Sequence, residues 1–232
     1  MDAVVVRGRV QRSDARAEAR LIRRPNLLSG ERLPSPPRQK RSLEKRERLK
    51  SAALDIFRRK GYHAAAIDEI ARKAGLPVGG FYQHYRSKRQ LLLALMDEMI
   101  AAMARLDLRD IEHSGDTRSS LRDFLARAFS GDFAYLGAYR AWQEAALSDP
   151  ALARHQRRIR AWTLGRVIRF FRRLETLPGA RKAVDIPVLA RAMDLFFWNL
   201  LGEAVQRKRA GLDTWLDAAT HLIYHALFTD PV

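Results

Sequence analysis

Residues 66–85, AIDEIARKAGLPVGGFYQHY, have the pattern of two short helices joined by a tight turn. In the first half, apolar residues recur at helical spacing, and Gly75 stands where the chain must take a left-handed conformation. Pro77 can open the second helix at its first position. The stretch therefore predicts a helix-turn-helix, a motif whose second helix enters the DNA major groove when it binds DNA.

Caps and stops predict further helices on both sides of this motif. Ser87 and Gln90 form a capping box that opens one of them. The pair Asp149-Pro150 opens another, long helix. No segment alternates with period two for long enough to be a strand, so we expect an all-α fold. The expected helices outside the motif span 42–60, 87–103, 149–177, 187–209 and 213–226.

The composition excludes several classes of protein. The 232 residues include no cysteine, which excludes disulfide scaffolds, cysteine-ligated zinc, iron–sulfur clusters and thiol nucleophiles. No apolar run approaches the roughly 18 residues that a membrane span needs. The arginine-rich N-terminus lacks the apolar segment of a signal peptide. We expect a cytoplasmic protein that does not contact membranes.

Positive charge is concentrated in the first part of the chain. The formal net charge is +17, of which residues 1–90 carry +14 and residues 91–232 only +3. A basic segment joined to a nearly neutral remainder predicts a polyanion-binding module beside a module with another task. A generally arginine-rich proteome would not produce this boundary.

Residues 1–40 are expected to form a basic, proline-containing arm that is disordered. The run Leu33-Pro34-Ser35-Pro36-Pro37 cannot be helical, because proline removes backbone donors and restricts the residue before it. Two interpretations stay open. Either the arginines of the arm add non-specific DNA affinity, or the start codon is assigned too far upstream and the segment has no function.

Several spaced residues in and around the motif resemble one known family. They are Gly61-Tyr62, Asp68-Glu69-Ile70-Ala71, Ala74-Gly75-Leu76, Gly79 to Tyr85, Ser87-Lys88 and Leu91. In register over residues 42–104, the chain is similar to the N-terminal domain of the TetR family of transcriptional regulators. The resemblance implies a DNA-binding domain at residues 41–88 and a helical effector-binding and dimerisation domain at residues 89–232. It also implies a homodimer on double-stranded DNA, a repressor released by a small hydrophobic ligand, and neither an enzymatic activity nor a cofactor.

The resemblance also assigns candidate DNA-binding residues. Tyr82 and Lys88 match positions that contact phosphates, and Gln83 matches the reading face, where it could pair with an adenine. The hydroxyl residues common in the family are absent at Ala65 and Ala66, so part of the specificity is expected to come from DNA shape. The full set is Lys40, Arg41, Val78, Gly79, Gly80, Tyr82, Gln83, His84 and Lys88.

The sequence pattern of the C-terminal helices predicts an apolar interior and contact with a partner subunit. The stretch 195–201, LFFWNLL, is apolar nearly all round, so this helix must be covered on more than one side. Aromatic residues at helical spacing are either plain core or the wall of a ligand pocket, and both interpretations stay open. The candidates for the pocket wall are Tyr135, Tyr139, Trp142, Trp162, Phe170, Phe171, Phe196 and Phe197.

Other functions have weaker support in the sequence. His221 and His225 have the spacing of two metal ligands on a helix, but no third ligand is evident, so we expect no metal. Neither a phosphate-binding loop nor a catalytic-triad motif occurs, which leaves an all-helical enzyme without a nominated site. The second alternative is an architectural DNA-binding protein that needs no ligand and has little sequence preference.

Overall fold

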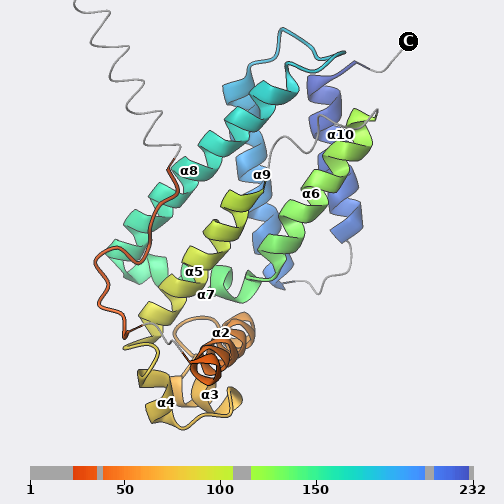
Figure 1. The fold of residues 1–232 in the computed structure, drawn as a ribbon. Helices are drawn as coiled ribbons and strands as arrows, with labels where there is room; N and C mark the ends of the chain where they lie inside the picture. Colours follow the sequence, from red (N-terminus) through yellow and green to blue (C-terminus); the bar gives the residue numbers. More distant parts are fainter. Residues whose placement is uncertain (1–22, 36–38, 107–115, 207–211, 230–232) are drawn as a thin grey trace, which may run out of the picture.

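The computed structural model describes residues 23–35, 39–106, 116–206 and 212–229, which form helices joined by short connections (Figure 1). Among these residues the only β pairing is one isolated bridge between Ala180 and Phe228. The expected all-α fold is confirmed. The described helices are α2 (Lys40–Lys60), α3 (Ile67–Lys73), α4 (Val78–Tyr82), α5 (Lys88–Arg105), α6 (Thr117–Phe133), α7 (Leu136–Ser148), α8 (Pro150–Leu174), α9 (Ile186–Gln206) and α10 (Leu212–Leu227).

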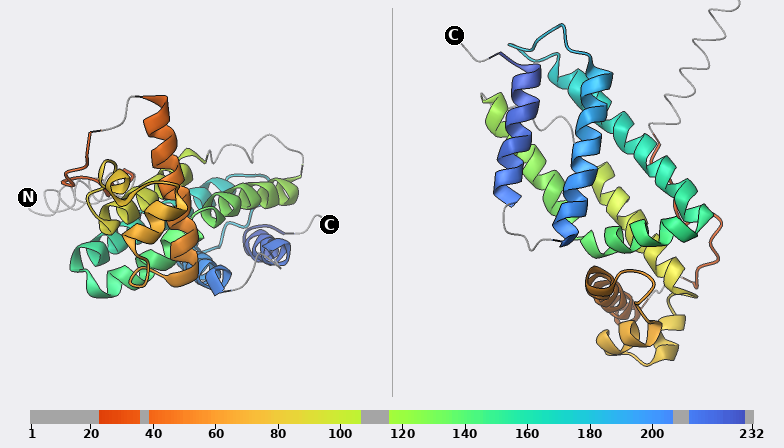
Figure 2. Two further views of the ribbon diagram at one scale, coloured as in Figure 1. Left: turned by 90° about the horizontal axis from the view of Figure 1, so that it is seen from below. Right: turned by 180° about the vertical axis from the view of Figure 1, so that it is seen from behind.

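The helices form a small head and a larger body. The head contains α2, α3 and α4 and lies at one end of the molecule (Figures 1 and 2). The body contains α6 to α10, and α7 lies across its base, packed against α2 of the head. Helix α5 starts beside the head and continues into the body, so it belongs to both parts.

Local signals in the sequence determine several helix starts. Asp149 accepts the first backbone N–H groups of α8, as its place before a proline predicts. Ser87 Oγ accepts the N–H of Gln90 at the start of α5. The side chain of Gln90 reaches back to the N–H of Arg86, one residue before the position of a standard capping box. Both caps are therefore confirmed, the second with a small change of partner.

Residues 23–35 pack against α5, which differs from the disordered arm expected there. Leu27 is fully buried, and its backbone N–H donates to Asp97 Oδ1 at 3.0 Å. Arg24 pairs with the same carboxylate at 2.9 Å. The segment is not helical, as its prolines predict. The Asp97 carboxylate of α5 accepts one of its backbone N–H groups, that of Leu27. We call residues 24–33 the strap.

The other end of the strap reaches the place where α5 and α8 begin. Glu31 pairs with Arg89 at 2.5 Å, and Arg89 also pairs with Asp149 at 2.8 Å. Arg89 thus joins the start of α5 to the N-cap residue of α8, and Glu31 of the strap pairs with the same guanidinium group. Residues 1–22 and 36–38 of the expected arm lie outside the described residues.

Truncating Leu27 is expected to destabilise the protein. Leu27→Ala removes a fully buried side chain, which costs about 2–5 kcal/mol of unfolding free energy. Leu147→Ala is the control, because Leu147 is 90% exposed and its loss should stay within about 0.5 kcal/mol. Urea unfolding followed by circular dichroism measures both. Equally small effects would mean that the strap is not docked in solution.

Candidate nucleic-acid interface and interior cavity

The turn between α3 and α4 has the conformation that its glycine predicts. Gly75 has a φ of 68°, in the left-handed region. The N–H of Leu76 donates to Ala71 O at 2.9 Å, and that of Gly75 donates to Arg72 O at 3.0 Å. These two bonds form a Schellman ending, which satisfies the last carbonyls of α3 and sets the direction in which α4 leaves.

Four of the candidate DNA-binding residues form the outer face of α4. Val78 is 44% exposed and Tyr82 is 50% exposed, and Gly79 and Gln83 are exposed as well. No atom lies within 4 Å of the point where a side chain at Gly79 would begin, so another molecule can approach the backbone closely. We call these four residues the α4 face.

Gly80 of α4 and His84, which follows the end of α4, are both buried in the head. A Cβ at Gly80 would lie 3.3 Å from Leu76 Cβ. His84 is buried, and its pKa is lowered by burial and by the nearby charges of Arg46 and Lys45. The burial of His84 differs from the place on the reading face that the resemblance implies for it.

Lys88 is engaged by the backbone of the head. Its Nζ donates to the carbonyl oxygens of Tyr62 at 2.6 Å, Ala65 at 2.7 Å and His63 at 3.3 Å. An ammonium group has three hydrogens, so these bonds use all of them. Burial lowers the pKa of Lys88. Lys88 thus holds the loop between α2 and α3 against α5, which differs from the phosphate contact implied by the resemblance.

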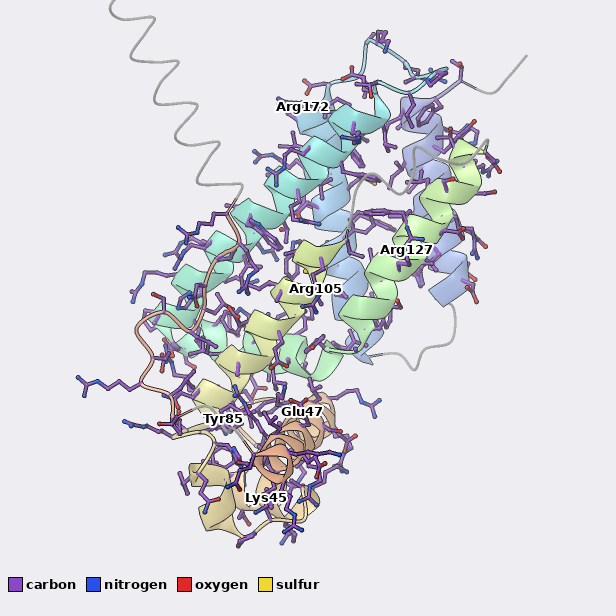
Figure 3. All side chains as sticks on the ribbon, viewed as in Figure 1. Lys45, Glu47, Tyr85, Arg105, Arg127 and Arg172 are labelled. Carbon is purple, nitrogen blue, oxygen red and sulfur yellow. The ribbon has the colours of Figure 1, made fainter. Side chains whose placement is uncertain are left out.

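Further exposed cations lie on the head. Lys40 and Arg41 are exposed in the first turn of α2, which begins two residues earlier than expected. Arg48 Nη1 lies 3.4 Å from the place of a Cβ at Gly75, beside the turn of the motif. Lys45 is exposed on the same helix (Figure 3). The sequence does not distinguish Arg48 or Lys45 from the other cations of this segment, because a basic composition marks such residues only as a group.

Helix α7 packs closely against the C-terminal end of α2. At Gly137 the two helices approach so closely that a Cβ would overlap the carbonyl group of Leu54. One turn farther along α7, Arg140 Nη1 donates to Arg58 O at 2.5 Å and to Arg59 O at 3.2 Å. These are carbonyls of the last turn of α2, where a cation is favourable.

Glu144 continues the same face of α7 and holds the loop that follows α2. Its carboxylate accepts the N–H of Tyr62 at 2.6 Å and that of His63 at 3.0 Å. Burial raises the pKa of Glu144, but the two N–H donors and nearby positive charge lower it by more. Because the folded pKa is below the ordinary value, this contact stabilises the fold at neutral pH and is lost as the pH falls through the lowered pKa. We call Gly137, Arg140 and Glu144 the α7 clamp.

A methyl group at Gly137 is expected to loosen this clamp. Gly137→Ala would press on the carbonyl of Leu54 and should lower the free energy of unfolding by about 1–3 kcal/mol. Gly131→Ala in α6 is the matched control, because nothing lies within 4 Å of its added Cβ. There alanine should raise stability by up to about 1 kcal/mol. Thermal unfolding should give shifts of opposite sign, and a stabilising effect of both would contradict the close packing.

The body contains an apolar cavity of about 130 Å³ between α5, α6, α8, α9 and α10. Three of the candidate pocket residues line it: Phe170, Phe171 and Phe197. Three further aromatic residues, which were not among the predicted pocket residues, also line it: Phe124, Phe129 and Trp198. Spacing along one helix does not show which of its aromatic residues face a gap between several helices.

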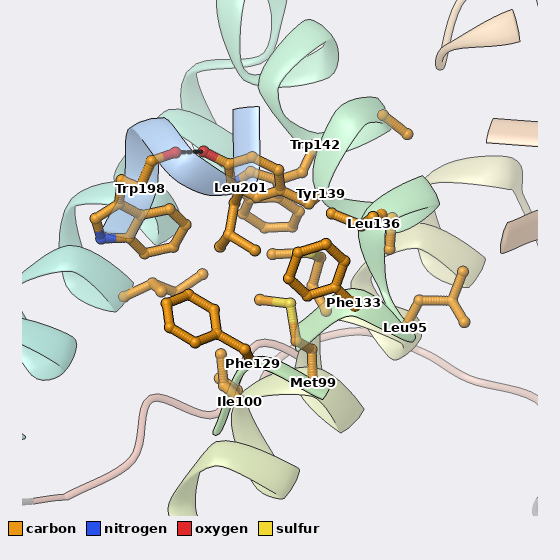
Figure 4. Close-up of a cluster of buried hydrophobic side chains, with 14 of the residues drawn as sticks. Leu95, Met99, Ile100, Phe129, Phe133, Leu136, Tyr139, Trp142, Trp198 and Leu201 are labelled. Atoms are coloured by element: carbon orange, nitrogen blue, oxygen red, sulfur yellow. Dashed lines mark hydrogen bonds between the residues drawn. The ribbon is translucent and has the colours of Figure 1, made fainter. Parts of the chain in front are cut away.

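The other candidate pocket residues do not line this cavity. Tyr139 and Trp142 are fully buried in the core of the body. The Tyr139 hydroxyl donates to Trp198 O at 3.1 Å (Figure 4), and burial raises the pKa of Tyr139 to about 12. Tyr139 therefore links α7 to α9 as a protonated donor. The remaining three candidates outside the wall are Tyr135, Trp162 and Phe196.

Three polar side chains interrupt the apolar wall of the cavity. They are Thr163 and Arg166 from α8 and Asp194 from α9. Arg166 Nη2 donates to Met103 O at 2.9 Å, near the end of α5. Met103 itself lines the cavity. Helix α5 therefore extends from the Lys88 contact in the head to the cavity in the body.

The described residues contain neither a membrane-spanning helix nor a cluster suited to a metal ion. No described helix combines the length and apolarity needed to cross a bilayer. In the same part of the chain, no three or more potential ligand residues come together. The rings of His221 and His225 lie 4.3 Å apart on α10.

The sequence of the head is similar to known sequences. Residues 49–95 match the family of bacterial regulatory proteins called the tetR family. The HTH-type transcriptional activator FasR of Mycolicibacterium smegmatis is 37% identical over 79 residues, which cover 34% of this chain and 36% of FasR. The HTH-type transcriptional regulator SrpR of Pseudomonas putida is 42% identical over 53 residues, 23% of this chain and 25% of SrpR. The matched part thus spans little more than a third of the first relative and a quarter of the second.

Solved structures share the fold over most of the chain. SmeT, the repressor of the Stenotrophomonas maltophilia multidrug efflux pump SmeDEF, is 19% identical with a TM-score of 0.59, covering 81% of this chain and 93% of SmeT. NalD, the secondary repressor of the MexAB-OprM multidrug efflux pump in Pseudomonas aeruginosa, is 19% identical with a TM-score of 0.58, covering 83% of this chain and 100% of NalD. At these identities the likeness concerns the fold alone. The head thus matches the tetR family of bacterial regulatory proteins over residues 49–95, and the described helices share the fold of SmeT and NalD.

Proposed function

We propose that the protein is a homodimeric, sequence-specific DNA-binding regulator, a repressor that a small hydrophobic ligand releases from its operator. The α4 face is the observation that carries this proposal. It presents the second helix of a helix-turn-helix at the end of the molecule remote from the body (Figure 1). A helix presented in this way can enter the major groove without a clash from the body.

The residues of the α4 face and its surroundings suit two kinds of DNA contact. The Gln83 amide can donate to and accept from the edge of an adenine. The Tyr82 hydroxyl can donate to a phosphate. Exposed cations of the head, Lys40 and Arg41 among them, supply attraction that does not depend on sequence. Since few polar side chains face outward from α4, DNA shape supplies the rest of the specificity.

Apolar residues exposed on α9 and α10 support dimerisation. Val188 and Leu195 are seven residues apart on α9, and Trp215 and Leu222 are seven apart on α10, so each pair shares a helix face. Figure 2 shows both helices on one side of the body. In a single subunit, Leu195 stays 52% exposed and Leu222 48%. The same face of a second subunit would cover them and bring two heads to two half-sites.

The cavity and α5 provide a path from a ligand to the head. Helix α5 lines the cavity at Met99 and Met103, and at its other end Lys88 holds the head loop. A ligand that favours another placement of α5 would change the spacing of the two α4 faces. A tenfold loss of DNA affinity requires a preference of about 1.4 kcal/mol for that state. A loss of DNA binding on ligand entry corresponds to relief of repression.

Two substitutions should separate base reading from phosphate contact. Gln83→Ala should weaken operator binding by about 1–3 kcal/mol and leave random duplex unchanged, because it removes a base-edge contact. Tyr82→Phe should weaken both duplexes alike without changing the salt dependence, because it removes a neutral donor to phosphate. Fluorescence anisotropy measures both. If Gln83→Ala affected both duplexes equally, Gln83 would have no reading role.

Charges placed on the α9–α10 face should give a monomer. Leu195→Arg combined with Leu222→Arg would bury unpaired cations in the proposed interface, which is strongly unfavourable. Leu147→Arg is the control, because Leu147 is 90% exposed on α7 and lies on neither helix. Sedimentation velocity gives the subunit number of each variant. A dimer that survives the double substitution would place the interface elsewhere.

The function as a whole is tested by titrating the protein with its own upstream DNA and with random duplex at several salt concentrations. Binding at least about 10³-fold tighter to the upstream fragment would support a specific regulator. Equal and steeply salt-dependent binding to both would favour the architectural alternative. Failure to bind either duplex would reject DNA binding by the head.

A further inference from the structure

The two charged groups of the cavity differ in how well their charges are compensated. Arg166 Nη2 donates to Met103 O at 2.9 Å and to Leu106 O at 3.3 Å. Its guanidinium also lies 5.2 Å from the centre of the Trp162 ring, an arrangement in which the ring face attracts a cation. Arg166 thus has partners for its charge without a ligand.

Asp194 has much less compensation. Its Oδ1 lies 3.2 Å from Thr163 Oγ1, which also lies 3.0 Å from Arg160 O. A hydroxyl has one hydrogen, so Thr163 cannot donate fully to both. Within the described ranges, no cationic nitrogen lies within 4.0 Å of the Asp194 carboxylate. Burial raises the pKa of Asp194, and bonds from Thr163 and Trp198 and the charge of Arg160 offset this only in part.

The surroundings of Asp194 restrict what can supply the missing charge. Phe129, Phe170 and Phe197 form an aromatic wall around the same cavity. If one water needs about 10–15 Å³ of such space, a cavity of about 130 Å³ holds on the order of ten water-sized groups. This suits an aromatic ring with a short chain. A hydrated inorganic cation would leave the aromatic wall uncovered.

We propose that the cavity binds an amphipathic amine, with its aromatic or alkyl body between the phenylalanines and its protonated nitrogen on the Asp194 carboxylate. This inference rests on the proposed effector site and names its ligand class. An amine supplies the cation that Asp194 lacks and leaves the bonds from Arg166 to α5 intact. An acid would instead have to compete with the α5 carbonyls for Arg166. The charge pattern therefore favours amines over acids.

Three compounds that differ only in their head group test this preference. The probes are 4-phenylbutylamine, 4-phenylbutan-1-ol and 4-phenylbutanoate, each titrated into the full-length protein at pH 7 by calorimetry. We expect the amine to bind at least about tenfold tighter than the alcohol, and the carboxylate to bind weakest, because a buried carboxylate attracts a cation and repels an anion. Absence of binding by all three, or tightest binding by the carboxylate, would overturn the proposal.

The isosteric variant Asp194→Asn locates the preference. It should weaken amine binding by about tenfold and leave the affinity for the alcohol within about twofold, so that the two compounds become similar. Asp217→Asn is the control, because it removes the same charge from a residue that is exposed on α10 and absent from the cavity wall. An amine preference that survives Asp194→Asn would also overturn the proposal. If that variant does not fold, the ranking of the three probes on the unaltered protein still decides.

DNA titrations run in parallel separate this inference from the proposed function. Specific DNA binding without an amine preference would leave the regulator and reject the ligand class. An amine preference without any DNA binding would leave the ligand class and reject the regulator.

Discussion

The contact of α7 with α2 is the constraint on which the rest of the structure depends. It requires a residue without a side chain at Gly137, because the carbonyl of Leu54 occupies the place of a Cβ. Arg140 then neutralises the negative end of α2, and Glu144 holds the loop that leads to α3. The head is therefore fixed to the body through backbone atoms, whose positions vary less than those of surface side chains. Any rearrangement that reaches α7 must also move α2.

Helix α5 is held at both ends by the same kind of interaction. At its start, its own Lys88 donates to carbonyls of the head, and near its end Arg166 of α8 donates to carbonyls of α5. In both places a partly buried cation donates hydrogen bonds to backbone carbonyls. Such bonds are directional, so they fix the helix along its axis and resist sliding. Asp194 is the exception in the cavity, which is why it stands out as a place for an external charge.

Short-range chemistry was predictable from the sequence, and long-range packing was not. Gly75, Ser87 and Asp149 act on neighbours within a few residues, so the turn and the caps could be read directly. The partners of Lys88 lie more than twenty residues away in a loop of the head, which no local pattern reveals. The inward placement of His84 depends in the same way on distant residues, because the charges near it, Arg46 and Lys45, belong to α2. The wall of the cavity depends on five helices at once, so spacing along one helix identified only some of its aromatic residues.

The strap has a consequence for the order of events during synthesis. The partner of Leu27 is Asp97, 70 residues farther along the chain. At about 5–20 residues per second, the ribosome needs roughly 4–14 s to make that distance. During this interval Leu27 has no burial site, while α2, α3 and α4, which lie between the two residues, are already being completed. The strap can therefore dock on α5 only after the helix-turn-helix has been made, so the first described residues to be translated are among the last to reach their final place.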